Sequence, residues 1–335
     1  MIDELDLALV DALRVDPRAP WSRLAAPLGV DPATLSRRWA RLTATGDAWV
    51  TCYPSADRIG YGLTALLEVE CQADRVGEVA ARLAQDAQAA SIEVVTGSAD
   101  LLLTVAALDT ASLTRYVLDR VGVLPGVLRT RTSLVERTLR EGSRWQDGAL
   151  DAEQREAILR TPAPPAGGPG RGVALDRSLL LALGADARMP YAELAQRTGV
   201  PASTARRWLT ELRDSGRLVL RCDASPRLTG HPVGVLLWLD LPAARLEAAA
   251  DWLAELQQTR MCVLTVGAAN LALYVMIRHL PELRRFEEEL GNRLPEAVIR
   301  DRQVTLRTVK LVGRLLDPEG RATGYVPIDL WQQGS

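Results

Sequence analysis

The sequence is almost without lysine. Of its 40 basic residues only Lys310 is a lysine, a bias that we attribute to a GC-rich genome rather than to function. Cysteine is also scarce, and the four cysteines are far apart without C-x-x-C spacing: Cys52, Cys71, Cys222 and Cys262. This usage predicts reduced, small core residues in a cytoplasmic protein rather than a disulfide framework or a zinc site.

Catalytic and metal-binding motifs are lacking as well. His231 and His279 are the only histidines, and neither has a second ligand at metal-binding spacing. The chain has no glycine-rich phosphate loop and no G-x-S-x-G nucleophile motif. We therefore predict that the protein is not an enzyme and holds no metal and no cofactor.

Long apolar runs and a strong net charge are absent too. No segment approaches the 18 uninterrupted apolar residues of a membrane span. Three of the first six residues are acids, unlike the start of a signal peptide. We expect a cytoplasmic protein with no membrane partner. Because the formal net charge is −2, any binding of nucleic acid must come from local basic patches.

What the chain does contain is an internal repeat with a constant offset of 170 positions. Between residues 5 and 46, 16 of 42 positions are identical to those of the second copy. The offset persists downstream, where Gly97 matches Gly267 and Leu124-Pro125 matches Leu294-Pro295. Two copies at one offset indicate a tandem duplication rather than a solenoid. Proline and glycine between the copies, from Thr161 to Gly172, predict an extended linker.

The N-terminal part of each copy has the pattern of a helix-turn-helix. An amphipathic helix over residues 3–14 precedes two short helices within Trp21–Leu42, which are joined by a turn at Gly29. Asp31 and Pro32 suit the start of the last helix. Its apolar stripe is Leu35, Trp39 and Leu42, and its polar side is Thr34, Ser36, Arg37, Arg38 and Arg41. Such a helix suits the major groove of DNA, where arginine reaches guanine edges or phosphates.

The rest of each copy alternates strands and helices in the order β-α-β-β-α-β, the ferredoxin-like pattern. In the first copy the expected strands are 63–71, 91–96, 101–107 and 127–139, and the expected helices are 74–87 and 110–121. In the second copy the expected elements are 233–241, 243–257, 262–267, 271–277, 280–290 and 299–312. Because strand 101–107 is apolar on both faces, we expect a second sheet to cover the face that the helices leave open.

Together these segments predict an α+β chain of two helix-turn-helix (winged-helix) domains and two ferredoxin-like domains. The expected domains are residues 1–50 and 51–140 in the first copy, a linker over 141–172, residues 173–220 and 221–312 in the second copy, and a tail over 313–335 whose role we leave open.

At this point the chain resembles the leucine-responsive regulator/AsnC (Lrp/AsnC) family of transcription factors. The resemblance is carried in order by Leu5-Asp6, Asp16-x-Arg18, Leu24-Ala25, Gly29-Val30, Thr34, Arg41-Leu42, Gly46, Gly60-Tyr61, Gly97-x-x-Asp100, Leu124-Pro-Gly-Val127 and Thr132. It implies a DNA-binding domain followed by an effector and oligomerisation (RAM-type) domain. It also implies double-stranded DNA, an amino acid-like effector and further copies, or the chain's own second copy, as partners.

The resemblance also assigns candidate residues. It places the DNA-reading positions of the first copy at Thr34, Ser36, Arg37, Arg38 and Arg41, and those of the second copy at Ser203, Thr204, Arg206 and Arg207. It places effector contacts near the loop with Gly97, Ser98 and Asp100. The second copy departs from the pattern, because Trp208 replaces Arg38 and Glu211 replaces Arg41. We therefore expect the second copy to have a weaker or different role on DNA.

Two alternatives stay open. The first is a sirohaem decarboxylase, since these enzymes resemble this chain in fold. They carry a strand rich in His, Arg and Tyr, whereas the matching segments 91–96 and 261–266 of this chain contain none of these residues. A bound tetrapyrrole would give a Soret band, which a DNA regulator lacks. The other alternative is a regulator that binds no effector and acts only by assembly.

Overall fold

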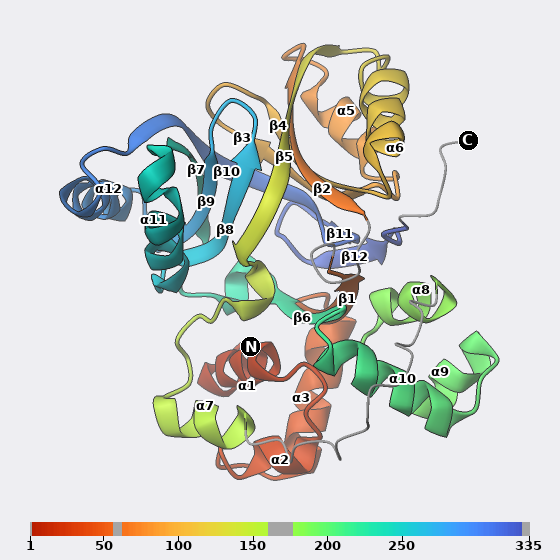
Figure 1. Cartoon of the computed structure of the whole chain (residues 1–335). Helices are drawn as coiled ribbons and strands as arrows, with labels where there is room; N and C mark the ends of the chain where they lie inside the picture. The colour runs from red at the N-terminus through yellow and green to blue at the C-terminus, as the bar shows by residue number, and fades with distance from the viewer. Residues whose placement is uncertain (1, 56–61, 160–176, 330–335) are drawn as a thin grey trace. The chain divides into compact units, whose positions relative to one another are not determined.

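The computed structural model of the chain describes residues 2–55, 62–159 and 177–329. The expected linker Thr161–Gly172, Gly60-Tyr61 and Trp331 lie outside the described residues. The chain divides into two compact units, and each takes one domain from each copy of the repeat (Figure 1). Unit 1 comprises residues 1–60 and 146–229, and unit 2 comprises residues 61–145 and 230–335. None of the described helices is long and apolar enough to cross a membrane.

The first half of unit 1 is the predicted helix-turn-helix. It consists of helices α1 (Glu4–Val15), α2 (Trp21–Ala25) and α3 (Pro32–Ala44), followed by strand β1 (Ala48–Pro54). Asp31 begins α3 as predicted, since its carboxylate accepts a hydrogen bond from the backbone N of Thr34 at 2.9 Å. Gly29 has a φ of 67°, which the turn between α2 and α3 requires. The three helices bury Leu9, Leu13, Leu24, Leu35 and Leu42.

The second half of unit 1 repeats this arrangement. Its elements are α8 (Arg177–Ala185), α9 (Tyr191–Thr198), α10 (Ala202–Asp214) and β6 (Leu218–Ala224), followed by the short turn η3 (Pro226–Leu228). Gly199, the equivalent of Gly29, has a φ of 71°. Pro201 stands where the first copy has Asp31, so α10 begins without a side-chain hydrogen bond at its N-terminus.

The two halves of unit 1 are joined by reciprocal contacts. Strands β1 and β6 pair antiparallel over seven residues, with Thr51 opposite Arg221, which is its own equivalent at the repeat offset of 170. Helix α1 packs against β6 and helix α8 packs against β1. A residue that faces its own equivalent indicates a local two-fold relation, as in the isologous interface of a homodimer.

Two equivalent arginines reinforce this relation. Arg18 donates hydrogen bonds to the carbonyl oxygens of Ala187 and Met189, and its guanidinium lies 4.6 Å from the ring centroid of Tyr191. In return, Arg188 donates to the carbonyl oxygens of Pro17 and Ala19 at 2.7 and 3.1 Å and stacks on Trp21 at 3.9 Å. Burial lowers the pKa of Arg188 to about 10, so the group is still charged at neutral pH.

A helix that the sequence analysis did not predict lies in the segment assigned to the linker. The short turn η2 (Gly142–Arg144) is followed by helix α7 (Ala152–Leu159), so residues 141–172 are not linker throughout. Asp151 and Gln154 form reciprocal hydrogen bonds at the start of α7. The segment is held to unit 1 by Asp11, whose buried carboxylate accepts from three successive backbone amides of residues 147–149.

The first half of unit 2 is the predicted ferredoxin-like domain. Its elements are β2 (Leu63–Cys71), α5 (Val76–Leu83), β3 (Ala89–Val95), β4 (Leu101–Ala107), α6 (Thr110–Arg115) with the π-helix η1 (Tyr116–Val121), and β5 (Val127–Arg140). The strands pair antiparallel in the order β3-β4-β2-β5. Apolar residues of α5, α6 and η1 share one buried cluster with one face of this sheet.

The second half repeats the fold with β7 (Val233–Asp240), α11 (Ala243–Glu255), β8 (Thr259–Val266), β9 (Leu271–Ile277), α12 (Pro281–Arg293) and β10 (Val298–Leu311). The long strands β5 and β10 pair first within their own copy and then with a strand of the other copy, β8 and β3 respectively. The two sheets thereby join into a closed ring of strands. The expectation that a second sheet covers the open face is confirmed by a buried cluster that includes Leu66, Leu102, Leu236 and Trp238.

The tail contains structure that the sequence analysis left open. Strands β11 (Arg314–Leu316) and β12 (Ala322–Tyr325) extend the sheet beyond β10. A tight turn connects β10 to β11, and both turn residues have positive φ, 47° for Val312 and 80° for Gly313. Positive φ at both positions is typical of a two-residue hairpin turn.

The only lysine is fully buried near this extension. Lys310 lies on β10 between Ile92 of β3 and Leu315 of β11, and its Nζ donates to the carbonyl oxygen of Asp86 at 2.8 Å. Burial lowers the pKa of Lys310 to about 8, although the charge of Asp86 acts in the opposite direction. All four cysteines are buried and unpaired, as predicted.

We expect Lys310→Met to be more stable than the wild type at pH 7, because the variant removes a buried charge. The ordinary pKa of lysine is about 10.5, so between pH 8 and 10.5 the unfolded wild type holds a proton that the folded wild type has lost. The free energy of unfolding of the wild type therefore rises with pH relative to that of the variant, by at most about 3 kcal/mol. Urea denaturation of both proteins from pH 7 to 10.5 measures this; a constant difference would contradict it.

Candidate functional site

The last helix of the first helix-turn-helix has one buried side and one polar side. Leu35, Trp39 and Leu42 are buried, which confirms the predicted apolar stripe. The candidate DNA-reading residues lie on the remaining surface of the helix, where Ser36, Arg37 and Arg41 are exposed and Thr34 and Arg38 are half-buried.

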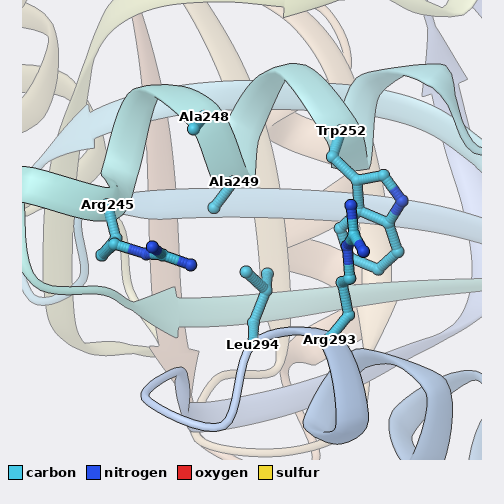
Figure 2. Close-up of a pocket in the computed structure, with 6 residues that line it drawn as sticks. All are labelled: Arg245, Ala248, Ala249, Trp252, Arg293 and Leu294. Carbon is cyan, nitrogen blue, oxygen red and sulfur yellow. The ribbon is translucent and has the colours of Figure 1, made fainter.

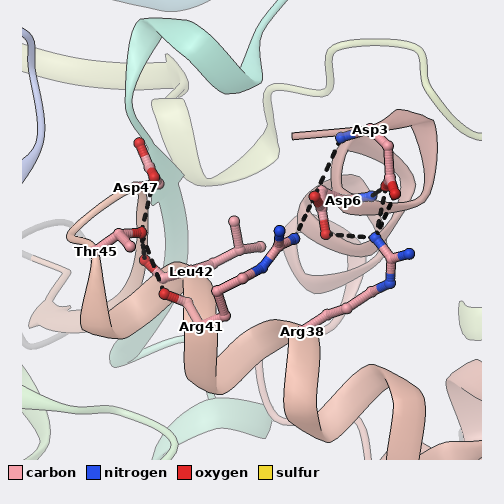
Figure 3. Close-up of polar contacts among 7 residues, drawn as sticks. All are labelled: Asp3, Asp6, Arg38, Arg41, Leu42, Thr45 and Asp47. Carbon is pink, nitrogen blue, oxygen red and sulfur yellow. Dashed lines mark hydrogen bonds and ion pairs between the residues drawn. The ribbon is translucent and has the colours of Figure 1, made fainter. Parts of the chain in front are cut away.

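Two of these arginines are held by carboxylates at the start of α1 (Figure 3). One guanidinium nitrogen of Arg38 lies 2.6 Å from Asp3 and 2.9 Å from Asp6, and Arg41 lies 2.5 Å from Asp6. Asp3 and Asp6 also form the capping box that begins α1. The hydrogen bond from Arg38 holds the pKa of Asp3 below its usual value, and the same bond raises the pKa of Arg38. We call this set of Asp3, Asp6, Arg38 and Arg41 the acid clamp.

Arg37 is in a different situation. Its guanidinium donates a long hydrogen bond to the hydroxyl of Thr34 at 3.4 Å, and it forms no ion pair with any described residue. The hydroxyl of Thr34 is in turn bonded to the helix-capping carboxylate of Asp31 at 2.6 Å. Within the first copy, Arg37 is therefore the recognition-helix cation whose charge no described residue compensates.

The second copy presents two such cations. Arg206 and Arg207 are exposed on α10, and neither forms an ion pair within the part of the chain that the structure describes. Ser203 is exposed beside them and Thr204 is half-buried. Of the two departures from the family pattern, Trp208 is half-buried and Glu211 lies 3.5 Å from Arg217.

The candidate effector loop connects β3 to β4 in unit 2. Gly97 has a φ of 96°, and the carboxylate of Asp100 accepts from the backbone N of Cys71 at 2.7 Å. In the second copy the side chain of Asn270 accepts from the backbone N of Leu241 at 3.1 Å in the same manner. Because both copies use this contact, Asp100 has a role in fixing the turn that does not depend on a ligand.

Ser98 points into a polar group that both copies contribute, which we call the Ser98 cluster: Glu68, Ser98, Arg131, Asp301 and Gln303. The Ser98 hydroxyl donates to Asp301 at 2.7 Å and lies 3.3 Å from Glu68. The Gln303 amide donates to Glu68 at 2.6 Å and to Asp301 at 3.0 Å, while Arg131 donates to Glu68 at 3.2 Å. Burial acts to raise the pKa of Asp301, but the hydrogen bonds from Ser98 and Gln303 outweigh it and keep the pKa below its usual value.

One acceptor of this cluster has no hydrogen-bond partner in the described part of the chain. Gln303 is fully buried, and its side-chain oxygen forms no hydrogen bond among the described residues. A buried acceptor without a hydrogen bond lowers the stability of the fold by about 1–3 kcal/mol. A hydrogen-bond donor on a ligand would recover part of this free energy by binding there.

The equivalent position in the second copy is built differently. Trp238 replaces Glu68, Ala268 replaces Ser98, and Ser133 stands where the first site has Gln303. The loop of Gly267 lies so close to Ser133 that a Cβ on Gly267 would be 2.3 Å from the hydroxyl oxygen. Arg131 and Asp301 are equivalent to each other at the repeat offset, so the two sites differ in the other three positions: Glu68, Ser98 and Gln303 against Trp238, Ala268 and Ser133. The second site is also closely packed.

Most of the Ser98 cluster was missed by the sequence analysis. Glu68 and Arg131 are opposite each other on neighbouring strands, and Glu68 is a charged residue at a buried position of an otherwise apolar strand. That buried charge was a readable signal. Asp301 and Gln303 come from the other copy, and no pattern within one copy places them beside Ser98.

Two family profiles match the chain. The profile of the AsnC-type helix-turn-helix domain matches residues 2–43 and again 174–213, and that of the Lrp/AsnC ligand binding domain matches residues 64–145. The two helix-turn-helix matches agree with the tandem duplication.

Each of two relatives matches about the length of one copy of the repeat. The HTH-type transcriptional regulator AldR of Mycolicibacterium smegmatis is 31% identical over 148 residues, which cover 42% of this chain and 85% of AldR. The HTH-type transcriptional regulator FL11 of Pyrococcus horikoshii is 27% identical over 141 residues, which cover 42% of this chain and 93% of FL11.

A solved structure with the same fold spans both copies. The siroheme decarboxylase NirDL aligns with a TM-score of 0.56 over 91% of this chain and 92% of that chain, at 14% sequence identity. This likeness concerns the fold alone. Given the two profiles and the identity to AldR, the chain belongs to the Lrp/AsnC family of HTH-type transcriptional regulators.

Proposed function

We propose that the chain is a sequence-specific DNA-binding transcriptional regulator that responds to an amino acid or a related small metabolite. The observation that carries this proposal is the pair of recognition helices in one compact unit, with Arg37 on one and Arg206 and Arg207 on the other. These exposed guanidinium groups have no internal counter-charge among the described residues. Phosphates and guanine edges are their complementary partners.

The ion pairs also change the order in which we rank the two copies. In the acid clamp, Arg38 and Arg41 share their charge with two aspartates, so a phosphate must compete with Asp3 and Asp6. Arg206 and Arg207 face no such competition. We therefore propose that the second copy contributes at least as much to DNA binding as the first, contrary to the expectation from the sequence.

For the effector we propose the Ser98 cluster. Its two carboxylates and the unpaired oxygen of Gln303 suit a donor such as an ammonium group. Arg131 has further N–H groups for a ligand carboxylate. Both groups occur in an amino acid. Since the equivalent position in the second copy has Trp238, Ala268 and Ser133 in place of Glu68, Ser98 and Gln303, we propose that each chain binds one effector molecule.

A second candidate function is that of the siroheme decarboxylase NirDL, favoured by the shared fold across both copies. Residues 91–95 belong to β3 and residues 261–266 belong to β8, and segments 91–96 and 261–266 contain no His, Arg or Tyr. Because only the fold is shared at 14% identity, we rank this function second. A saturable shift of the Soret band of added sirohaem is the observation that would reverse the ranking.

We expect the double variant Arg206→Ala/Arg207→Ala to bind DNA at least tenfold more weakly than the wild type. Loss of two phosphate contacts would also reduce the magnitude of the negative slope of log K against log[salt] by nearly two, where K is the association constant for DNA. Fluorescence anisotropy on a duplex selected from a random-sequence pool by the wild type measures both values. Arg197→Ala on α9 is the control, because Arg197 is exposed but paired with Glu193. Unchanged affinity in the double variant would refute this role of α10.

For the acid clamp we predict a variant that binds DNA more tightly rather than more weakly. We expect Asp3→Asn to raise DNA affinity several-fold, since it removes one competing carboxylate while asparagine can still cap α1. Glu4→Gln removes the same charge from the neighbouring exposed position, outside the clamp, and serves as the control. An equal gain in both variants, measured by the same anisotropy titration, would show that the clamp has no specific effect.

For the effector site we expect a single binding event per chain. Calorimetric titration of the full chain with each of the twenty amino acids should give at least one ligand with a stoichiometry near one. Ser98→Trp should abolish its binding, whereas Ala268→Trp, an equally exposed position in the other copy, should leave it within twofold. Two sites per chain, or equal loss in both variants, would refute the assignment. If none of the amino acids binds, the effector-independent regulator becomes the better description.

A further inference from the structure

A pocket lies on the helical layer of the second ferredoxin-like domain, and none of its lining residues belongs to the Ser98 cluster or to the recognition helices. Helix α11 and the end of α12 enclose a pocket of about 340 Å³ lined by Arg245, Ala248, Ala249, Trp252, Arg293 and Leu294 (Figure 2). This volume falls at the lower end of the range of small-molecule sites.

The lining combines cationic ends with an apolar middle. Figure 2 shows Arg245 at one end, Arg293 with Trp252 at the other, and Ala249 and Leu294 between them. The guanidinium of Arg293 lies 5.9 Å from the ring centroid of Trp252, and Arg293 forms no ion pair with any described residue. Arg245 is held through its Nε by Glu296 at 2.9 Å. A small organic anion with an apolar body matches this distribution.

The first copy supplies an internal comparison. There, Arg75 and Arg82 occupy the positions of Arg245 and Trp252, and both donate to the carboxylate of Glu78 at 2.7 Å. The second copy has Ala248 in place of Glu78. The second copy therefore has no carboxylate at this helix position, and Arg245 pairs with Glu296 instead.

Further exchanges rearrange the charges of the second copy. Arg293 replaces Val123, Trp252 replaces Arg82 and Glu296 replaces Gly126, so both copies have two arginines and one carboxylate at this place in the fold. In the second copy the carboxylate pairs with Arg245, and Arg293 has no counter-charge among the described residues.

We propose that this pocket binds a small organic carboxylate. The carboxylate group pairs with Arg293 beside Trp252. The apolar body lies on Ala249 and Leu294, which are buried and already part of the domain core. Arg245 limits the far end of the pocket.

Hexanoate is a suitable probe, because it joins one carboxylate to an aliphatic chain that fits the apolar middle. We expect saturable binding of hexanoate to the full chain by calorimetry or ligand-observed NMR, and no binding of hexylammonium. Ala248→Glu should weaken hexanoate binding at least tenfold, because it restores the internal carboxylate at an exposed helix position. Arg293→Ala should weaken it to a similar extent.

Arg82→Ala in the first copy is the matched control and should leave hexanoate binding unchanged. Circular dichroism shows whether each variant is folded. The proposal is overturned if hexanoate does not saturate the wild type, if hexylammonium binds equally well, or if binding survives both Ala248→Glu and Arg293→Ala. None of these measurements uses DNA or an amino acid effector, so the result is independent of the proposed function.

Discussion

The pairing of each domain with its own duplicate is the constraint on which the rest of the structure depends. In unit 1 this pairing is the β1–β6 ladder, centred on Thr51 and Arg221, and the reciprocal contacts of Arg18 and Arg188. In unit 2 it is the joining of β5 to β8 and of β10 to β3, which closes the ring of strands. Contacts of this isologous kind form between subunits in a homodimer. Here covalent linkage supplies both partners, so their association does not depend on protein concentration.

Covalent duplication also permits asymmetry. In a homodimer a substitution appears at both equivalent positions, whereas here each copy can change alone. Three exchanges illustrate this: Arg38 against Trp208 on the recognition helices, Glu68 against Trp238 between the sheets, and Glu78 against Ala248 on the helical layer. Each removes an ionic group from the second copy. In the two exchanges within unit 2, the polar interaction that remains in the first copy is absent from the second. The proposals about DNA, effector and carboxylate all follow from such differences.

The sequence was sufficient to predict those helices, strands and turns that are specified by neighbouring residues. Periodic leucines, the turn glycines Gly29 and Gly97 and the capping Asp31 specify elements from residues within one helix or hairpin, and these elements are confirmed. Helix α7 was missed although Asp151 and Gln154 carry a readable capping signal. The acid clamp and the Ser98 cluster could not be read in this way. Arg38 and Asp3 are 35 positions apart, and Ser98 and Asp301 are 203 apart, so their contacts depend on how helices and copies pack.

This architecture restricts how an effector could act on DNA binding. One way for an effector to act would be to change the spacing of the two recognition helices. Within unit 1, however, such a change would have to break a ladder of seven residue pairs and the carbonyl contacts of Arg18 and Arg188. A ligand can shift an equilibrium only by its differential affinity for the two states, typically about 1–3 kcal/mol for allosteric coupling. Since each net hydrogen bond contributes about 0.5–1.5 kcal/mol, breaking this interface costs more than such a ligand supplies. An effector bound in unit 2 would therefore act on unit 1 as one body, with the spacing of its recognition helices preserved.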